Sequence, residues 1–393
     1  MSESAPLTAL HDGYGHLRVA IVHDWLVVQG GAEKVLDALL EAFPQAELFT
    51  LVDFLPAEQR GRIARHRVQT SLIQRLPLAR HRYRHYLPWM PYAIEQFDLS
   101  DFDLVISSSH AVAKGVLTHP GQRHYCYCHT PMRYAWDMKE AYLRDANFPA
   151  PIEWAVRRSL KRLRQWDHFT ASQVDHFIAN SANVAGRIAK FYRRDATVIH
   201  PPVDLPRDLA PDAPREDFYL AASRLVPYKR IDLIIEAFKR DGRRQLKVVG
   251  DGPERKRLAQ LAAGANNIQL LGYQPDAVLS DLMSRTRAFV FAADEDFGIL
   301  PLEAQAHGAP VIAYGHGGAL ETVRGIESAE QATGLFFDVQ TADSLLSAIE
   351  RFESLTFSPA ALHQQVQRFT RTHFWQALYQ VLASPDAMTE PLS

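Results

Sequence analysis

The sequence predicts an α/β protein with two doubly wound, Rossmann-like domains, each built on a parallel sheet. Short apolar segments of strand length alternate with helix-length segments along the chain, a pattern typical of parallel strands joined by helical crossovers. A proline-rich stretch interrupts this alternation near the middle of the chain. At 393 residues, the chain is long enough for two domains that each bury a core.

The first half of the chain contains five strand-like segments that are rich in β-branched, aromatic and other apolar residues. They lie at residues 17–22, 48–52, 103–107, 125–128 and 176–180. The segments between them are long enough to hold crossover helices. We therefore expect an N-terminal Rossmann-like domain over residues 1–200.

The second half repeats the same alternation. Its strand-like segments lie at residues 218–222, 246–250, 268–272, 288–292, 310–314 and 334–338. They predict a second Rossmann-like domain over residues 216–368, followed by a helix over 369–382. Between the two domains, five prolines occur from His200 to Arg215 without apolar periodicity, which predicts a linker over residues 201–215.

Composition excludes several classes of protein. A net charge of -2 gives no general sign of nucleic-acid binding, and no run of 18 apolar residues predicts a spanning helix. Residues 1–15 are polar and lack the apolar core of a signal peptide, so a cytoplasmic location is the expectation. The two cysteines, Cys126 and Cys128, are too closely spaced for a disulfide or a typical metal site and suit a buried strand.

Basic residues gather in two places. Residues 59–94 contain eight arginines and no acidic residue, interleaved with leucine, tyrosine and tryptophan. This stretch is either a solvated helical face or a surface that binds an anionic membrane. Residues 154–166 predict an amphipathic helix. The residues expected to face inward are Trp154, Leu160, Leu163 and Trp166.

The segment 292–308 carries the strongest functional signal. Glu295 follows a strand-like segment and is expected in a loop, whereas Glu303 is expected about one turn into the next helix. Open parallel sheets bind ligands at the carboxyl ends of their strands. Two carboxylates at that edge can accept hydrogen bonds from the vicinal hydroxyls of a ribose or a hexose.

Cations and glycines also follow strand-like segments of the sequence, as Glu295 does. Arg224 and Lys229 follow the first strand of the second domain and precede a helix. Positive charge is mildly unfavourable at a helix start, so a simple surface role is disfavoured and phosphate binding is favoured. Gly30 and Gly31 follow the first strand of the chain and open a helix, where glycine allows close approach of a ligand.

Four motifs in this order resemble those of retaining, nucleotide-sugar-dependent glycosyltransferases of family 4. They are G-G-A-E-K-V-L (30–36), R-L-V-P-Y-K-R (224–230), V-V-G-D-G-P (248–253) and the E-x7-E of Glu295 and Glu303. The resemblance covers roughly residues 17–383. The segment Y-C-H-T-P-M-R-Y-A-W-D is similar to bacterial mannosyltransferases of polysaccharide and O-antigen assembly.

This resemblance implies the GT-B fold, in which two Rossmann-like domains face each other across a cleft and a C-terminal helix, here within 369–393, crosses back to the first domain. It implies transfer of a hexose with retained configuration and without an obligatory metal. The favoured donor is GDP-mannose. The acceptor is a glycan or a polyprenyl-diphosphate-linked saccharide in cell-surface polysaccharide synthesis, and the enzyme would be cytoplasmic or peripheral on the inner face of the membrane.

The resemblance also implies roles for single residues. His129, at the tip of a strand, would contact the transferred sugar, although a capped loop histidine is the alternative. Arg224 and Lys229 would bind the diphosphate, and Glu303 the ribose. The residues assigned to the sugar are Glu295 and the backbone of Phe297, Gly298, Ile299 and Leu300, and those assigned to the base are Gly272 and Tyr273.

Alternatives remain open at this point. UDP-glucose, UDP-galactose and UDP-N-acetylglucosamine are other donors. The segments D-F-D (101–103) and D-E-D (294–296) match the D-x-D of metal-dependent glycosyltransferases, which have a different, single-domain fold. An NAD-dependent enzyme that modifies nucleotide sugars would need G-x-G-x-x-G after the first strand, which is absent. A non-catalytic scaffold would be expected to lack the glutamate pair or the cations.

Overall fold

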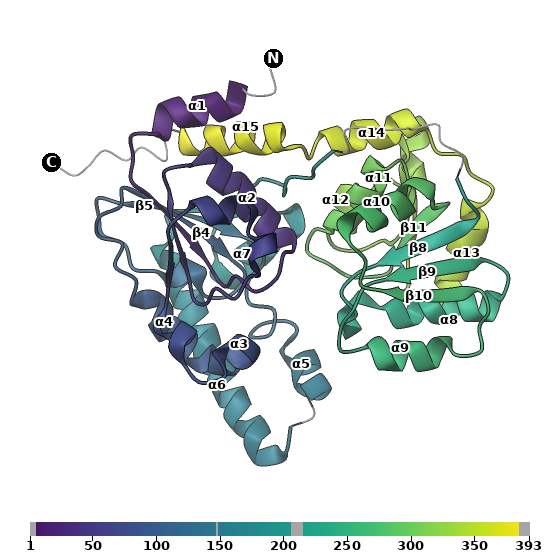
Figure 1. Cartoon of the computed structure of the whole chain (residues 1–393), viewed down its shortest axis with the longest axis horizontal. Coiled ribbons are helices and arrows are strands. Elements are labelled where there is room, and N and C mark those ends of the chain that lie inside the picture. Colours follow the sequence, from purple (N-terminus) through teal and green to yellow (C-terminus); the bar gives the residue numbers. More distant parts are fainter. Residues whose placement is uncertain (1–4, 147, 206–214, 385–393) are drawn as a thin grey trace. The chain divides into compact units, whose positions relative to one another are not determined.

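The computed structural model describes residues 5–146, 148–205 and 215–384. Its internal contacts divide the chain into two compact units (Figure 1). Unit 1 joins the chain up to Pro202 with the segment from Arg371 onwards, and unit 2 is Val203–Thr370. Each unit is built on one parallel sheet, so the predicted pair of doubly wound domains is confirmed.

The sheet of unit 1 has seven strands in the order β3-β2-β1-β4-β5-β6-β7, all parallel. The strands are β1 Val19–His23, β2 Glu47–Thr50, β3 Val68–Thr70, β4 Leu104–Ser109, β5 Arg123–Cys128, β6 His176–Ala179 and β7 Ala196–Val198. The central strands β1 and β4 are buried along their whole length, which explains the apolar sequence of most of β1 and of the first half of β4. The edge strands β3 and β7 were not predicted, because three residues are too few to show a periodicity.

Helices cover this sheet on both faces. The longer ones are α1 Ala5–Tyr14, α2 Gly31–Ala42, α5 Lys139–Ala146, α6 Ala150–Thr170, α7 Ala182–Tyr192 and α15 Arg371–Leu382, and the short ones are α3 Ala79–Arg82 and α4 Met90–Glu95. Helix α15 belongs to unit 1 although it comes last in the sequence. It buries Phe374 and Leu378 in the core that includes β1, and the Trp375 indole donates to the carbonyl of Ala38 in α2 at 3.0 Å.

The sheet of unit 2 has six strands in the order β10-β9-β8-β11-β12-β13, again all parallel. The strands are β8 Phe218–Ala222, β9 Gln245–Val249, β10 Ile268–Gly272, β11 Ala288–Phe291, β12 Val311–Tyr314 and β13 Gly334–Phe337. The helices are α8 Ile231–Asp241, α9 Arg255–Ala262, α10 Asp276–Arg285, α11 Ile299–Ala306, α12 Ala319–Thr322, α13 Ala342–Phe352 and α14 Pro359–Gln367. Every predicted strand of this half is present within one residue of its predicted ends.

The predicted linker, residues 201–215, is only partly described, because residues 206–214 lie outside the described ranges. Val203, the first residue of unit 2, is packed within that unit. Val203 is 1% exposed, and its amide donates to the carbonyl of Phe369 at 2.8 Å.

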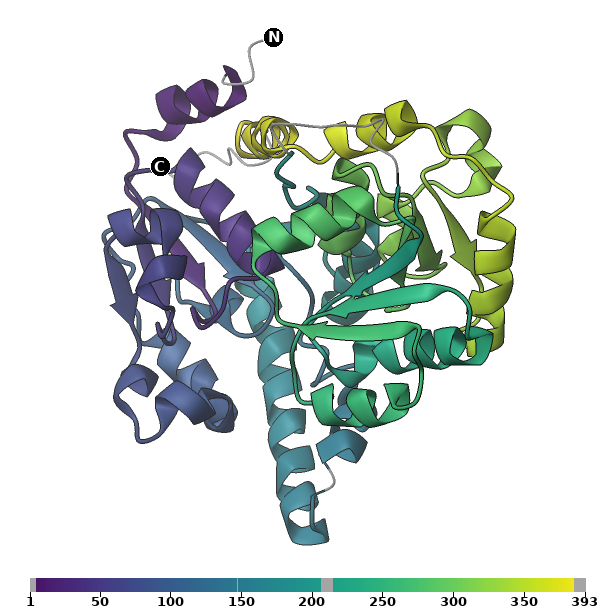
Figure 2. The ribbon, with the colours of Figure 1, turned by 45° about the vertical axis from the view of Figure 1, so that its right-hand side comes forward.

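Helix α6 differs from its prediction in one respect. Leu160 and Leu163 are buried as expected, and Trp166 is half-buried with its indole donating to Glu95 at 2.7 Å. Trp154, however, is 68% exposed, so its predicted inward orientation is wrong. Six residues separate Trp154 from Leu160, which places the two side chains about 120° apart around a helix. Figures 1 and 2 show the first half of α6 extending away from the sheet, with α5 beside it.

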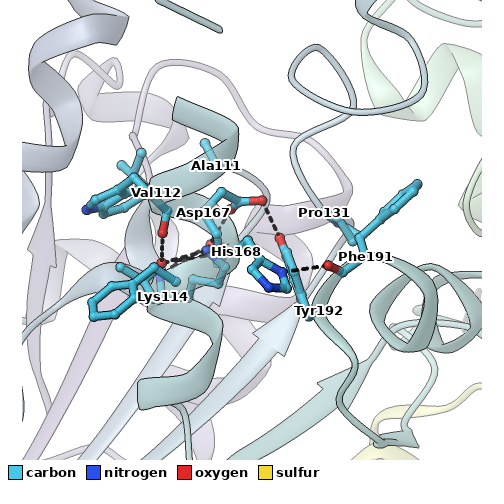
Figure 3. Close-up of polar contacts among 12 residues, drawn as sticks. Ala111, Val112, Lys114, Pro131, Asp167, His168, Phe191 and Tyr192 are labelled. Carbon is cyan, nitrogen blue, oxygen red and sulfur yellow. Dashed lines mark hydrogen bonds and ion pairs between the residues drawn. The ribbon is translucent and has the colours of Figure 1, made fainter. Parts of the chain in front are cut away.

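The second half of α6 is fixed by a buried ion pair, shown in Figure 3. Lys114 is 1% exposed and donates to Asp167 of α6 at 2.6 Å. The other oxygen of Asp167 accepts hydrogen bonds from the Trp136 indole at 2.7 Å and the Tyr192 hydroxyl at 2.9 Å. One carboxylate thus connects α6, α7 and the segments that follow β4 and β5. Within the described ranges, no helix has both the length and the apolar composition needed to cross a bilayer.

Candidate functional site

The strand order of unit 2 reverses once, between β8 and β11. The chain proceeds from β8 to β9 and β10 on one side, and then from β11 to β13 on the other. Loops that leave neighbouring strands at such a point diverge to opposite faces, and ligands of open α/β sheets bind between them. The two loops here are residues 223–230 and 292–298.

Lys229 and Glu295 bring these two loops together. The Lys229 ammonium forms an ion pair with the Glu295 carboxylate. The side chains are 14% and 17% exposed, so both are largely buried but still reach solvent. Arg230, which follows Lys229, has a φ of 53°, a left-handed conformation that is unfavourable for a residue with a Cβ. Strain of this kind is typical of functional loops held in place by their surroundings.

Arg224 lies in the same loop as Lys229, and its side chain is exposed. The glycine turn after β9 fixes the path of this loop. A Cβ on Gly250 would lie 1.8 Å from the carbonyl oxygen of Ser223, and a Cβ on Gly252 would lie 2.3 Å from that of Leu225. The V-V-G-D-G-P motif therefore serves close backbone packing beneath the cation-bearing loop.

The loop after β11 leads directly into α11. Gly298 has a φ of 85°, which glycine tolerates, and precedes the first helical residue, Ile299. The first N–H groups of a helix have no partner within the helix, so those of Ile299 and Leu300 can bind an anion or a hydroxyl. Glu303 lies one turn further on and is half-buried.

Two glycines after β12 support the backbone of this loop. The amide of Gly318 donates to the carbonyl of Glu295 at 2.8 Å. A Cβ on Gly317 would lie 2.4 Å from the Glu295 carbonyl oxygen, and a Cβ on Gly318 would lie 2.2 Å from Cα of Phe297. The segment G-H-G-G is therefore a packing surface for the loop that carries Glu295.

Gly272 ends the edge strand β10 and Tyr273 follows it, two strands away from β8, which precedes Lys229, and three from β11, which precedes Glu295. The carbonyl of Gly272 accepts a hydrogen bond from the amide of Gly250 at 2.8 Å, which connects it to the glycine turn. The Tyr273 side chain is 71% exposed.

Unit 1 has a corresponding reversal between β1 and β4. The Asp24 carboxylate, which is fully buried, follows β1 and connects it to the segment that follows β4. It accepts four backbone hydrogen bonds, at 2.6–2.9 Å, from the amides of residues 110–113. Successive amides of this kind form an anion-binding nest, and here the protein fills it with its own carboxylate.

His129 lies beside this point, at the end of β5, as predicted for a strand tip. Its Nε2 is 2.9 Å from the Ser108 hydroxyl, which is 3.1 Å from Nδ1 of His23. Nε2 of His23 lies 3.6 Å from the Glu33 carboxylate. His129, Ser108 and His23 thus form a hydrogen-bonded polar chain, and Glu33 of α2 lies within ion-pair distance of its His23 end. Because the Ser108 hydroxyl has a single proton, it can donate to only one of the two imidazoles, so the tautomers of His23 and His129 are linked.

Burial favours the neutral form of two histidines at this point, His129 and His110. The pKa of His129 is lowered well below its ordinary value, first by burial and then by the neighbouring His110 and His23. Burial also lowers the pKa of His110, although Asp24 opposes the change. A neutral His129 can donate one hydrogen bond and accept another, as contact with a sugar hydroxyl requires.

Gly30 and Gly31 are exposed, and α2 begins at Gly31, as predicted. Gly30 caps the helix without a side-chain hydrogen bond. A Cβ on Gly30 would lie 3.1 Å from Glu33, so a larger residue would crowd the acidic end of the polar chain. The two glycines and His129 thus lie along the carboxyl edge of the sheet of unit 1.

Comparisons with known proteins agree with this arrangement. The profile described as "Glycosyltransferase Family 4" matches residues 29–207, and the profile described as "Glycosyl transferases group 1" matches residues 210–369. The chain joins a family 4 glycosyltransferase domain to a group 1 domain. Unit 1 contains most of the family 4 domain, and unit 2 contains most of the group 1 domain.

Among relatives, the D-inositol 3-phosphate glycosyltransferase of Geodermatophilus obscurus is 34% identical over 39% of this chain and 41% of its own length. The corresponding protein of Salinispora arenicola is 29% identical over 52% of each chain. The chain thus spans about half the length, or less, of these curated relatives.

Solved structures show the fold. The lipopolysaccharide outer core galactosyltransferase WaaB has a TM-score of 0.61 at 15% identity, covering 93% of this chain and 99% of WaaB. Anabaena HepE, in complex with UDP and glucose, has a TM-score of 0.65 at 18% identity, covering 94% and 100%. The GT-B fold with its two Rossmann-like domains, expected from the motifs, is confirmed.

The polar residues at the switch point of the family 4 domain were not predicted. Asp24, His23 and Ser108 all end or follow strands β1 and β4. The signal was present, because H-D ends the apolar segment V-A-I-V and three serines end β4. Polar residues at the ends of buried strands mark the edge where sites form. Glu33 belongs to the G-G-A-E motif, but sequence alone did not connect it with His23.

The D-x-D segments have other partners. Asp103 accepts a hydrogen bond from the Arg18 amide at 2.8 Å, before the amino end of β4 and thus at the opposite edge of the sheet from His129. In the group 1 domain, Asp294 is 3.0 Å from the His316 imidazole. Throughout the described ranges, no three His, Cys, Asp or Glu side chains form a cluster suited to a metal ion.

Proposed function

We propose that this chain is a retaining glycosyltransferase that transfers a hexose, with mannose from GDP-mannose as the first candidate, to a glycan or lipid-linked saccharide in cell-surface polysaccharide synthesis. The observation that carries the proposal is the contact between Lys229 and Glu295 at the switch point of the group 1 domain. It joins a cation suited to the leaving diphosphate to a carboxylate suited to the sugar.

On the donor side, Arg224 and Lys229 bind the diphosphate. Negative charge grows on this group as the glycosidic bond breaks, so fixed cations stabilise the transition state more than the ground state. Glu303 accepts hydrogen bonds from the ribose hydroxyls. Glu295 and the backbone of residues 297–300 hold the hexose, and Gly272 with Tyr273 contacts the base.

In the family 4 domain, His129 contacts the transferred sugar, and Gly30 with Gly31 allows close approach of the donor. Ser108, His23 and Glu33 orient the imidazole through their polar chain. Retention of configuration is the outcome that the E-x7-E resemblance implies, and transfer would need no resident metal because the two cations supply the charge.

UDP-glucose is the second candidate donor. The solved structure of Anabaena HepE with UDP-glucose, which shares the fold at a TM-score of 0.63, supports it. The curated relatives, described as D-inositol 3-phosphate glycosyltransferases, make an inositol phosphate an acceptor to test beside a polyprenyl-diphosphate-linked saccharide.

A panel of nucleotide sugars tests the proposal. Purified protein is heated with GDP-mannose, UDP-glucose, UDP-galactose or UDP-N-acetylglucosamine, each in excess. The true donor at about a hundred times its Kd should add about 2.7 kcal/mol of stability. Lys229→Met should lose this shift, whereas Lys256→Ala, which removes an exposed lysine of α9, should keep it. A protein that no nucleotide sugar stabilises would contradict the proposal.

Transfer itself is then measured with the stabilising donor and each acceptor. The anomeric configuration of the product, determined by NMR, tests retention. Activity that is lost in EDTA and restored by Mg²⁺ or Mn²⁺ would contradict metal independence.

A further inference from the structure

We propose that unit 1 docks on an anionic lipid surface through a two-part docking face, made of residues 72–92 and of the first half of α6, residues 150–162. The inference deepens the proposed function, because it rests on an acceptor that is held at a membrane. It is carried by exposed cations and exposed aromatic side chains that occur together on both parts of the face.

The structure separates seven of the eight arginines of residues 59–94 into two groups, and Arg65, which is exposed, belongs to neither. In the first group, Arg60 pairs with Asp53 at 2.7 Å and Arg62 with Glu41 at 2.8 Å. Arg67 lies 3.6 Å from Glu47. These carboxylates lie outside the acid-free stretch in the sequence, so the uniform basic charge seen there does not persist in the fold. The first group is therefore excluded from the docking face.

The second group lies within residues 75–84 and comprises Arg75, Arg80, Arg82 and Arg84. All four are exposed, and within the described part of the chain none of them forms an ion pair with a carboxylate. Arg84 lies instead over the ring of Tyr83, 5.4 Å from its centroid. Four uncompensated charges on a short segment form a local positive field that attracts an anionic leaflet.

Large apolar side chains accompany these cations. Leu78 is 63% exposed, Trp89 is 65% exposed and Tyr92 is 54% exposed. Leu78 also has a φ of 57°, a left-handed backbone conformation that disfavours a branched side chain. A leucine that is both strained and turned to solvent is not explained by packing within the protein. Insertion into the acyl boundary of a membrane would give its side chain an apolar environment.

Helix α6 supplies the second part of the face. No side chain from residue 150 to 159 is buried, and Ile152 and Trp154 are 50% and 68% exposed. Lys161 and Arg162 are exposed about two turns beyond Trp154. Arg157 ties this half-helix to α5 by donating to Glu140 at 2.9 Å, and it also donates to Glu153 of α6 at 2.8 Å, so the projecting pair of helices in Figure 2 is braced.

The two parts share one core. Val156 and Leu160 of α6 pack in the same apolar cluster as Tyr83 and Met90. The two parts are therefore held in a fixed relation within unit 1. An anionic membrane fits this combination better than a protein partner does, because tryptophan and tyrosine favour the headgroup level while neighbouring cations bind lipid phosphates.

Cosedimentation with vesicles tests the proposal. The full-length protein is mixed with phosphatidylcholine vesicles, with and without phosphatidylglycerol, at low and high salt. The vesicles contain no acceptor, so the outcome does not depend on the donor or the reaction. We expect binding only to the anionic vesicles and release by salt. Protein that ignores anionic vesicles at low salt would overturn the proposal.

Two triple variants identify the face. R80Q/R82Q/R84Q should weaken binding on the order of a hundredfold, since each cation near the surface contributes about fivefold. The matched control R60Q/R62Q/R67Q removes the same charge from the paired group and should bind much more tightly than the first variant. Equal loss in both variants would overturn the assignment. GDP-mannose stabilisation should persist in R80Q/R82Q/R84Q, which separates loss of docking from failure of the donor site.

Tryptophan fluorescence locates the contact. Lipids with brominated acyl chains should quench emission from Trp89 and Trp154 and much less from the other four tryptophans. W89F/W154F should therefore lose the quenching. Wild-type emission that lipid does not quench would show that the face is not a membrane anchor. The same conclusion would follow if self-association without lipid shielded Trp89 and Trp154 from solvent.

Discussion

Glu295 and Glu303 have different surroundings, and we expect different effects from replacing them. Glu295 lies in a loop and pairs with Lys229, whereas Glu303 is half-buried on α11. Glu303→Ala should chiefly weaken binding of the free nucleoside diphosphate, because a ribose contact is lost. Glu295→Ala should chiefly lower kcat, because the sugar is held less well. Titration calorimetry and initial rates separate the two effects, and a reversed pattern would exchange the two roles.

Three buried histidines of the family 4 domain predict how stability depends on pH. Burial is the main cause that lowers the pKa of His110 and His129, and it lowers that of His124 to about 3. With its folded pKa near 3, His124 stays neutral in the folded chain over the range in which its unfolded form takes up a proton, near pH 6.5. Its contribution to stability is therefore complete above about pH 6.5 and is lost as pH falls, by about 1.4 kcal/mol per pH unit, and the lowered pKa values of His110 and His129 act in the same direction.

Urea unfolding at about pH 7.5 and about pH 5.5 measures this dependence. His124→Gln should flatten the slope, because one depressed histidine is removed. His81→Gln, at an exposed position, is the control and should leave the slope unchanged. An identical slope in His124→Gln and the wild type would show that His124 does not contribute.

Among elements, the loop before α11 depends on the glycines after β12. Gly318→Ala would place a Cβ 2.2 Å from Cα of Phe297, so the loop must move. We expect donor affinity to fall at least tenfold, a change of about 1.4 kcal/mol, with little change in overall folding. Gly186→Ala, within α7 with open space around the new Cβ, is the control and should bind donor normally. Unchanged affinity in Gly318→Ala would show that the loop adapts without cost.

The buried ion pair between Lys114 and Asp167 of helix α6 leads to a second prediction, on stability. Asp167→Leu leaves the Lys114 ammonium buried without its carboxylate, and breaking such a pair costs about 3–5 kcal/mol. The double variant Lys114→Met/Asp167→Leu removes the stranded charge and should recover part of that loss. Urea midpoints of the two variants decide the matter, and a double variant no more stable than the single one would contradict this account.

At the scale of the whole molecule, the sequence was sufficient for the two parallel sheets and for most of their strands. Buried parallel strands have continuous apolar sequences, which are recognisable from Phe218 to Phe337. The edge strands β3 and β7 escaped prediction because each contributes only three ladder residues. The inward orientation predicted for Trp154 was wrong because the residue pattern indicates an amphipathic helix but not how far along the helix its buried face extends.

The site was predictable where function is concentrated in a contiguous motif, as for Glu295 and Glu303. The contact of Glu295 with Lys229 needed the fold, because 66 residues separate the two. The polar chain from Glu33 to His129 needed it even more, since its members come from one helix and three strands. Sequence indicates which residues end strands, but the strand order decides which of them meet.

The Asp24 carboxylate has a further consequence. An anion attached to the chain competes for the amides of residues 110–113 at an effective concentration that free phosphate does not reach in solution. This place in unit 1 is therefore closed to phosphate, whereas the corresponding place in unit 2 is spanned by Lys229, which we propose exchanges its carboxylate partner for a diphosphate. We expect the two similar halves to divide their ligands by charge, with the uncharged sugar end of an acceptor, rather than its phosphate, nearest to Asp24.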